Sequence, residues 1–337
     1  MKRRTFLMGA GLAACDRRPR LNVFNWSSYI EPAMLTRFSD ETGIRVRYGV
    51  YESNEEMLAK VMTGNSGWDV VFPTHSRIGP MAHAGLLAPL DHRLLRNVGN
   101  LAERFQKPPW DAGLRYCVPY MWNATGIAYD RQLQPPLAAW SDLWEARLQG
   151  RLTMLDDAED VLGACLLKRG LPFDASDAGS LAVAKADAIA QKRLLRAYLN
   201  AEVRDQLVAG DVLAAQLWST TAQQAMRDAA NLAFAFPREG FPLYADNAVI
   251  LAESPRQSAA HRFLDYLLRP AVAAANARAA ETATANGAAL ALLPEALRNS
   301  PVLYPDTTVL ARGLWPQTIA REGQRRRDRV WTEIKAA

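Results

Sequence analysis

Seven side chains of two chemical kinds lie where the predicted strands of this chain end. They are the carboxylates Asp157, Asp160 and Asp246 and the aromatic rings Trp26, Tyr29, Trp218 and Tyr244. A carboxylate forms charge-assisted hydrogen bonds with an ammonium group, and the face of an indole or phenol ring attracts the same cation. Methylene groups between two ammonium groups would add about 0.8 kcal/mol each when they are buried against the rings. This set predicts a site for an organic cation such as a diamine or a polyamine.

Five short segments contain these side chains. Ligands of open parallel sheets bind beyond the carboxyl ends of the strands, and the sequence places the five segments there. We therefore expect them to lie together: 25–29, 74–76, 156–160, 218–220 and 244–246. The first two segments also carry hydroxyl groups: Ser27, Ser28, Thr74 and Ser76.

Two other interpretations of the acidic residues remain open. A pair of carboxylates can act as acid and base in a hydrolase, and Asp156, Asp157, Glu159 and Asp160 are candidates. The sequence has, however, no G-x-S-x-G elbow, no P-loop and no H-E-x-x-H motif. The acids could instead open a helix and complement its dipole, which suits Glu159 best. Three further tryptophans are assigned to packing: Trp122, Trp140 and Trp144.

Strand-like and helical patterns alternate over the first part of the chain. Apolar side chains predict strands over 21–24, 44–50 and 68–73. A proline at the first helical position and a glycine cap predict a helix over 32–43, and a capping box with a closing glycine predicts another over 53–64. This β-α-β-α-β order predicts a mostly parallel sheet covered by helices.

The rest of the chain continues the alternation. We expect strands over 116–130, 151–157 and 214–220 and helices over 177–200 and 258–280. The 337 residues are 49% hydrophobic and 22% charged, which is typical of a folded protein with roughly two domains. Two α/β lobes are therefore predicted.

The first residues have the layout of an export signal. Residues 1–14 combine a basic head, an apolar stretch that begins at Phe6 and a small-residue end. RRTFL resembles a twin-arginine motif, and LAAC resembles a bacterial lipobox whose cysteine, Cys15, is lipidated. We expect loss of residues 1–14 and a lipid on Cys15 to leave the mature chain in the periplasm, anchored to the membrane. An ordinary signal peptide with a chance cysteine is the alternative.

Charge argues against a nucleic-acid partner. The formal charge of +5 falls to about +2 without residues 1–14, which hold three basic and no acidic side chains. The densest basic cluster is Arg325, Arg326, Arg327 and Arg329, interrupted by Asp328. We interpret this cluster as a solvated helix face.

Cysteine and histidine usage predicts no metal and no cofactor, because no metal-ligand spacing occurs. Besides Cys15 the chain has Cys117 and Cys165, whose pairing in an oxidising compartment stays open. No run of about 18 apolar residues follows residue 20, so we expect no membrane span in the body of the chain.

Motifs distributed over the chain resemble one family. In order they are FNWSSYI, ETGIRVRYGVYESNEEMLAKV, WDVVFPT, VPYMWNATGIAYD, WSDLW, FPREG, AHRFLDYLLRP and LYP. From residue 21 to the C-terminus the chain looks like the polyamine-binding proteins of bacterial ABC importers, the spermidine/putrescine and putrescine receptors. The resemblance implies a two-lobe type II periplasmic solute-binding fold that closes on its ligand by a hinge motion. Lobe 1 would hold 21–123 and 245–293, and lobe 2 would hold 124–244 and 294–337.

The resemblance also implies site residues. It matches Trp26, Ser27, Tyr29, Thr74, Asp157, Asp160, Trp218, Tyr244 and Asp246. The chain departs at Ser28, where the family commonly has an acid, and at Ser76, where it has an aromatic or other contact. An aromatic expected within 282–285 is missing, and the family's glutamine matches Gln317 only with a shift of one residue.

The predicted function is that of a binding protein and not of an enzyme. We expect a lipid-anchored monomer that captures a putrescine- or spermidine-like cation between two lobes and presents it to ABC permease subunits. A ligand-sensing partner of a membrane signalling protein and a receptor for another cationic amine are the alternatives, and a carboxylate-based hydrolase is a remote one.

Overall fold

The computed structural model describes residues 19–337, so the expected signal segment and Cys15 lie outside the described residues. The strands are β1 (Arg20–Trp26), β2 (Arg45–Tyr51), β3 (Val70–Val71), β4 (Cys117–Asp130), β5 (Leu152–Met154), β6 (Leu195–Tyr198), β7 (Ala214–Trp218), β8 (Leu232–Ala235), β9 (Phe241–Ile250), β10 (Ala283–Thr284) and β11 (Gly313–Leu314). The helices are α1 (Pro32–Thr42), α2 (Asn54–Val61), α3 (Ile78–His83), α4 (Glu103–Gln106), α5 (Ala158–Lys168), α6 (Ala178–Lys192), α7 (Val203–Val208), α8 (Ser219–Asp228), α9 (Gln257–Leu267), α10 (Pro270–Ala280), α11 (Glu295–Arg298), α12 (Thr307–Leu310) and α13 (Arg321–Ala336). Short 3-10 helices are η1 (His75–Arg77), η2 (His92–Leu94), η3 (Val98–Asn100), η4 (Trp140–Trp144), η5 (Ala146–Leu148) and η6 (Gly287–Leu292).

The strands form a mixed sheet in the order β2-β1-β3-β9-β4-β7-β5-β6. Both ends of the sheet consist of parallel strands. At one end β1 pairs in parallel with β2 and β3, and at the other β5 pairs in parallel with β6 and β7. The middle is antiparallel: β9 runs against β3 and β4, and β4 runs against β7. The expectation of a mostly parallel sheet is therefore wrong for its centre, where two long strands return against their neighbours.

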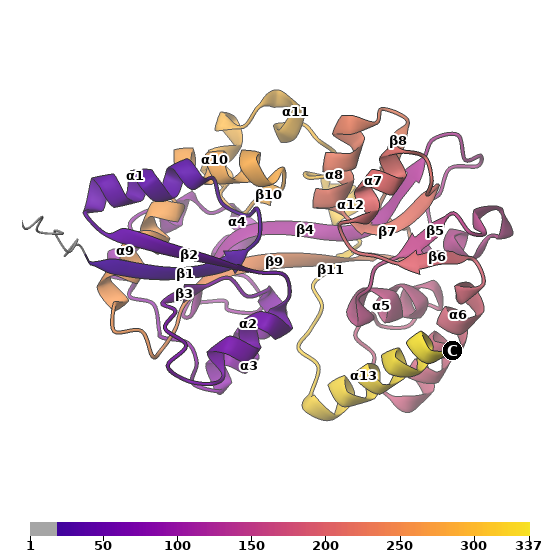
Figure 1. Ribbon diagram of the computed structural model, residues 1–337, viewed down its shortest axis with the longest axis horizontal. Coiled ribbons are helices and arrows are strands. Elements are labelled where there is room, and N and C mark those ends of the chain that lie inside the picture. The colour runs from indigo at the N-terminus through magenta and orange to yellow at the C-terminus, as the bar shows by residue number, and fades with distance from the viewer. Residues whose placement is uncertain (1–18) are drawn as a thin grey trace, which may run out of the picture.

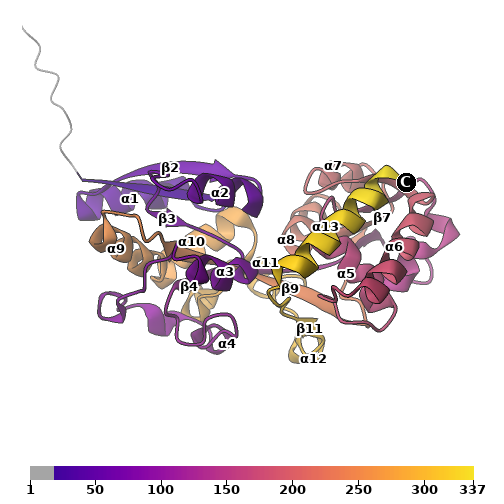
Figure 2. The ribbon, with the colours of Figure 1, turned by 90° about the horizontal axis from the view of Figure 1, so that it is seen from below.

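Two long strands join the halves of the molecule. β4 and β9 run from the half that contains β1 to β3, here lobe 1, to the half that contains β5 to β7, here lobe 2 (Figures 1 and 2). Helix α13 at the C-terminus lies in lobe 2, after a connection from β11 that passes between the halves (Figure 1). The predicted lobe boundaries at 123/124 and 244/245 fall inside β4 and β9, and they remain predictions.

The first helices form for the reasons their sequences indicate. Pro32 occupies the first turn of α1, where a missing N–H costs nothing, and Gly43 ends the helix with a left-handed φ of 71°. The Ser53 side chain accepts a hydrogen bond from the N–H of Glu56 and thereby caps α2. These caps fix where α1 and α2 begin or end after β1, which ends at Trp26, and β2, which ends at Tyr51.

Two predicted helices are shorter than expected. Helix α6 ends at Lys192, and residues 195–198 form strand β6, which pairs with β5. The segment 258–280 divides into α9 and α10 at Pro270, since a proline ring clashes with the preceding turn and supplies no N–H. Within the described residues, no helix is long and apolar enough to cross a membrane.

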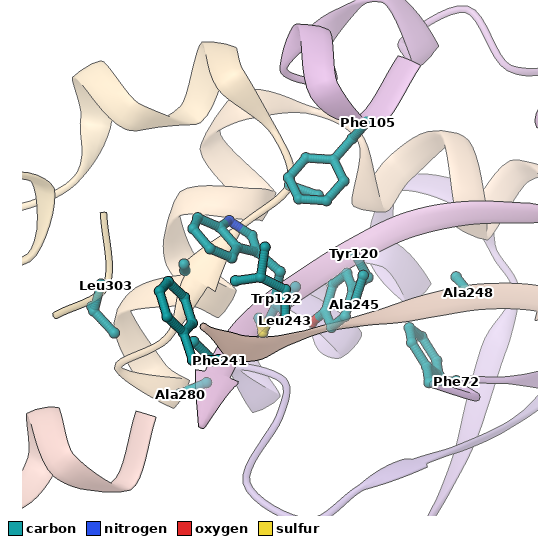
Figure 3. Close-up of a cluster of buried hydrophobic side chains, with 14 of the residues drawn as sticks. Phe72, Phe105, Tyr120, Trp122, Phe241, Leu243, Ala245, Ala248, Ala280 and Leu303 are labelled. Atoms are coloured by element: carbon teal, nitrogen blue, oxygen red, sulfur yellow. The ribbon is translucent and has the colours of Figure 1, made fainter. Parts of the chain in front are cut away.

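Buried aromatic and aliphatic side chains fill the space along β4 and β9. Trp122 lies on β4 among Phe105, Tyr120 and Phe241, as Figure 3 shows. Trp140 is completely buried, which confirms a packing role for these two tryptophans, and half-buried Trp144 packs at the edge of the same core. The core thus packs against β4 and against β9, the strand that carries both Tyr244 and Asp246.

Both described cysteines are free. Cys117 and Cys165 are buried in different hydrophobic clusters, so the structure contains no bond between them. Burial raises the pKa of both thiols, and that of Cys165 lies at about 12. They therefore act as small apolar core residues.

One arginine of the predicted solvated cluster lies inside the protein. Arg327 of α13 is 1% exposed, and its guanidinium donates to the carbonyls of Phe173, Ala175 and Glu159. The interpretation of the cluster as a solvated face is correct for Arg325 and Arg329 but wrong for Arg327. Helical periodicity explains the difference, because one residue in each turn of α13 faces α5 and its flanking loops.

Candidate binding site

Asp246 is a buried carboxylate in the middle of β9 and not in a loop, as its sequence context had suggested. Its Oδ1 accepts a hydrogen bond of 3.0 Å from the Thr74 hydroxyl. Thr74 is in turn held by Asn54, whose Nδ2 donates to the hydroxyl at 3.1 Å. Burial raises the pKa of Asp246 to about 7, although hydrogen bonding to Thr74 and Tyr29 opposes this shift.

Asp160 is the second buried carboxylate, at the start of α5. Its Oδ2 accepts from Trp218 Nε1 at 3.2 Å, and its Oδ1 accepts from the Tyr244 hydroxyl at 3.1 Å. Gln216 Nε2 donates to its backbone carbonyl at 2.8 Å. Burial and the nearby charge of Asp157 raise the pKa of the carboxyl group well above its usual range.

Asp157 caps the N-terminus of α5. Its Oδ1 accepts from the backbone N–H groups of Glu159 at 2.7 Å and Asp160 at 3.0 Å, so Asp157 is the N-cap of α5. The helix-start interpretation therefore fits Asp157 as well as Glu159. Burial raises the pKa of Asp157, and burial with the charge of Asp157 raises that of Glu159 to about 7.

The strand register places five side chains of this region on one face of the sheet: Tyr244, Asp246, Asn123, Thr125 and Trp218. Tyr244 and Asp246 are two residues apart on β9 and so point to the same side. Asn123 of β4 lies directly opposite Tyr244, and Thr125 of β4 lies opposite Trp218 of β7. Directly opposite residues of antiparallel strands share a face.

Sequence reasoning missed Asn123 and Thr125. The near-continuous apolar run of β4 shows no alternation, so its residues all read as core. The signal that would have found them is two polar residues two positions apart within that run, since such a spacing places both on one face.

Trp26, the last residue of β1, and Tyr29, three residues later, are held by different contacts. The Trp26 indole is fixed by a bond of 2.8 Å from Nε1 to the carbonyl of Phe72 and by ring contact with Tyr51 at 4.7 Å. The Tyr29 carbonyl accepts from the Tyr120 hydroxyl at 2.7 Å. Burial and the charge of Asp246 raise the pKa of Tyr29, which places its phenol beside that carboxylate.

Two predicted hydroxyl contacts lie at the edge of this arrangement. The Ser27 hydroxyl donates to Glu52 at 2.9 Å. Ser28 is exposed and has a left-handed φ of 55°, since the chain turns there between β1 and α1. The structure does not bring either side chain to Asp160 or Asp246.

Ser76 and Gln317 line a separate cavity of about 270 Å³. Its walls also include His75, Trp110 and Trp315. The cavity lies beneath the connection to α13, where the Thr318 hydroxyl donates to the Ser76 carbonyl at 3.1 Å and Gln317 Nε2 donates to the Trp315 carbonyl at 2.8 Å. The structure thus places Ser76 and Gln317 at this cavity, and their role as ligand contacts stays a prediction.

His75 lines the cavity and lies near Tyr244. The imidazole ring centre lies 6.1 Å from that of Tyr244, and it lies 4.9 and 5.4 Å from Trp110 and Trp315. Burial lowers the pKa of His75 to about 4, while its hydrogen bond to the Pro316 carbonyl acts in the opposite direction. The ring is therefore neutral at physiological pH, and it was not foreseen as part of this region.

The segment 282–285 offers a hydroxyl where an aromatic ring was expected. Thr282 is 1% exposed, its hydroxyl shares a hydrogen bond of 2.5 Å with that of Thr220, and it lies close enough to Tyr29 to lower the pKa of that phenol. In residues 19–337, no group of three or more His, Cys, Asp or Glu side chains could hold a metal ion.

Comparison with known proteins gives consistent matches over nearly the whole chain. The bacterial extracellular solute-binding protein family matches residues 33–301. The chain is 30% identical over 315 residues to the spermidine/putrescine-binding periplasmic protein of Escherichia coli, with 93% of this chain and 90% of that protein covered. It is 32% identical to the putrescine/cadaverine-binding protein of Pseudomonas aeruginosa, with 97% and 96% covered.

A solved structure agrees with the fold. The substrate-binding protein of a spermidine/putrescine ABC transporter from Streptococcus pneumoniae superposes with a TM-score of 0.85 at 27% identity, and the match covers 94% of this chain and 99% of that one. This likeness confirms the two-lobe type II periplasmic solute-binding fold expected from the sequence. The chain belongs to the bacterial extracellular solute-binding proteins.

Proposed function

We propose that this protein binds a polyamine of the putrescine or spermidine type between its lobes and delivers it to an ABC importer. The names of its relatives support this substrate class and this transport role. As a solute-binding protein it would perform no catalysis. Asp246 and Tyr29 would contact the ligand from lobe 1, and Asp160, Trp218 and Tyr244 would contact it from lobe 2.

One observation carries the proposal. Asp160 and Asp246 are buried carboxylates, and within residues 19–337 neither forms a hydrogen bond or an ion pair with a basic side chain. Arg77 and Arg327 act instead on the neighbouring acids Asp157 and Glu159. The partners of Asp160 and Asp246 are neutral donors: an indole N–H, a phenol and a threonine hydroxyl. A buried anion without a cation is costly, so it marks a place where a charged ligand supplies the missing compensation.

The rings beside these acids suit the apolar part of such a ligand. Trp218 and Tyr244 converge on Asp160, and Tyr29 adjoins Asp246. A linear amine that placed one ammonium at each acid would lay its methylene groups along these rings. Because the two acids belong to different lobes, this ligand would hold the lobes together.

We further propose that the mature protein is anchored by a lipid on Cys15 outside the cytoplasmic membrane. The lipobox-like LAAC sequence supports this, and the family description supports a location outside the cytoplasm. Metabolic labelling with an azido fatty acid tests the anchor. Label should enter the wild-type protein and be absent from a Cys15→Ser variant, and label retained in that variant would contradict the assignment.

Calorimetric titration of the protein without residues 1–14 tests the substrate class. Putrescine, cadaverine and spermidine are the ligands, with the neutral 1,4-butanediol and the anionic succinate as probes of matched length. Saturable binding of at least one polyamine, with neither control bound, is expected. Binding of butanediol or succinate with no polyamine bound below about millimolar concentration would refute the proposal.

A further inference from the structure

Asn123 occupies a central position on the sheet face that carries the candidate site. It lies opposite Tyr244 in the β4–β9 pair, and Tyr244 donates to Asp160. It also lies close enough to the Tyr29 phenol for its side chain to lower the pKa of Tyr29, and Tyr29 adjoins Asp246. Asn123 therefore lies next to Tyr244, which contacts Asp160, and next to Tyr29, which contacts Asp246.

The Asn123 side chain has an unused acceptor. Its Oδ1 is buried and has no hydrogen-bond partner, although the residue as a whole is only half-buried. Buried amide oxygens are nearly always paired, because leaving one unpaired costs about 1–3 kcal/mol. An unpaired acceptor between two carboxylates that form no ion pair with the protein indicates a position for a ligand N–H group.

The chemistry of the acceptor limits the kind of ligand. An α,ω-diamine that spans the two acids places only methylene groups between its ends, and it would leave Oδ1 unpaired. An amine with an interior N–H group can donate to Oδ1 while its terminal ammonium groups interact with Asp160 and Asp246. A carbonyl oxygen accepts this bond without adding a third negative charge to the site.

We propose that Asn123 is a specificity-determining residue that accepts a hydrogen bond from an interior N–H of the bound amine and so selects triamines over diamines of equal length. This inference rests on the proposed function, because it takes the two acids as the positions of the terminal ammonium groups. It assigns Asn123 a role in discrimination and leaves charge neutralisation to Asp160 and Asp246.

A matched pair of ligands tests the inference. Spermidine and 1,8-diaminooctane have the same number of atoms between their terminal nitrogens, and they differ in one interior position, which is an amine in one and a methylene in the other. The wild-type protein should bind spermidine more tightly. Because their charges differ too, the informative quantity is the change in the affinity ratio when Asn123 is replaced.

Asn123→Ala should reduce the ratio of spermidine affinity to 1,8-diaminooctane affinity by about tenfold or more. The variant loses the hydrogen bond to spermidine, and with diaminooctane bound it has no acceptor that stays unpaired. Asn123→Leu, which has the same number of heavy atoms, should act in the same direction without leaving a void. Thr153→Val is the matched control, because it removes another buried, unpartnered oxygen from β5, and it should leave the ratio unchanged.

The outcomes separate this inference from the proposed function. A ratio that stays within twofold of wild type in both folded Asn123 variants would refute the role of Asn123 and leave polyamine binding intact. Failure of the wild-type protein to bind either amine would overturn both proposals. Circular dichroism of each variant confirms that a changed ratio does not come from unfolding.

Discussion

Tyr244 and Asp246 lie two residues apart on β9, yet they take part in different hydrogen-bond groups. The Tyr244 hydroxyl donates to Asp160 at the start of α5, whereas Asp246 accepts from Thr74, which follows β3. Side chains at this spacing lie on the same face and about 7 Å apart along a strand. β9 therefore carries one carboxylate itself and, through the Tyr244 hydroxyl, holds the other, which lies on α5.

Replacing Asp246 should remove one ammonium position. In Asp246→Asn the amide keeps the shape and a hydrogen bond to Thr74 but supplies no charge. We expect affinity for putrescine to fall by more than about tenfold, because hydrogen bonds to charged groups contribute about 1.5–3 kcal/mol. Calorimetry measures the change. Asp40→Asn removes an exposed acid from α1 and should bind like wild type; an unaltered affinity in Asp246→Asn would refute the site.

The same substitution should stabilise the protein without ligand. A carboxyl whose pKa is raised from 3.8 to about 7 binds more protons folded than unfolded between these values, so its contribution to stability falls as pH rises through this window. Asn lacks this penalty. Urea unfolding of both proteins should agree closely near pH 4 and differ by up to about 4 kcal/mol in favour of the variant at pH 8. A less stable variant at pH 8 would contradict the raised pKa.

Polyamine binding should weaken in acid. The ionised form of Asp246 binds the ammonium, and its pKa of about 7 means that binding below neutrality must release a proton. Amines titrate near pH 10.4 and stay charged throughout, so they do not mask this effect. Putrescine affinity should rise from pH 5.5 to pH 8 and then level off. Titrations at pH 6.5 in buffers of different ionisation enthalpy should show proton release, and buffer-independent heats would count against the assignment.

Removing the Tyr244 hydroxyl should weaken putrescine binding only moderately. Tyr244→Phe keeps the aromatic surface and removes a donor that stabilises ionised Asp160. We expect an approximately fivefold loss of putrescine affinity, which corresponds to about 1 kcal/mol for one hydrogen bond. Tyr129→Phe, at a half-buried position farther along β4, is the control and should show no loss. Equal affinities of wild type and Tyr244→Phe would mean that Asp160 does not hold an ammonium group.

The sequence predicted the positions of Asp160 and Trp218 in the fold better than those of Tyr244 and Asp246. The structure has Asp160 beyond the end of β5 and Trp218 at the end of β7, as expected from the sequence, and their role as ligand contacts stays a prediction. The sequence misjudged the positions of Tyr244 and Asp246, which lie within β9, since alternation is absent from a strand buried on both faces. These two residues reach the site through antiparallel pairing, which depends on contacts distant in sequence.

Other parts of the site depend on tertiary structure alone. Asn123 lies opposite Tyr244 only because of the register between β4 and β9, and no local pattern fixes a register between distant strands. Ser76 and Gln317 are predicted ligand contacts, and only the connection to α13 brings them together at one cavity with His75. Local propensity defined the helix starts and caps well, whereas the packing of the C-terminal connection could not be inferred from composition.

Arg327 provides a test of what attaches α13 to the start of α5. Its guanidinium is buried and donates to three carbonyl oxygens, one of which belongs to Glu159 in the first turn of α5. Burial lowers the pKa of Arg327, while the charge of Glu159 raises it. Arg327→Ala would leave these carbonyls without their donor and create a void, so we expect a loss of about 2–4 kcal/mol in the free energy of unfolding.

The control lies on the same helix. Arg329→Ala removes an exposed arginine two residues farther along α13 and should change stability by less than about 0.5 kcal/mol. Urea unfolding of the three proteins at one pH measures the difference. Because Arg327 holds the backbone of Glu159, next to Asp160, the Arg327 variant should also bind putrescine more weakly under conditions where it remains folded. Equal stability of the two variants would show that the buried arginine is dispensable and that apolar packing alone attaches α13 to lobe 2.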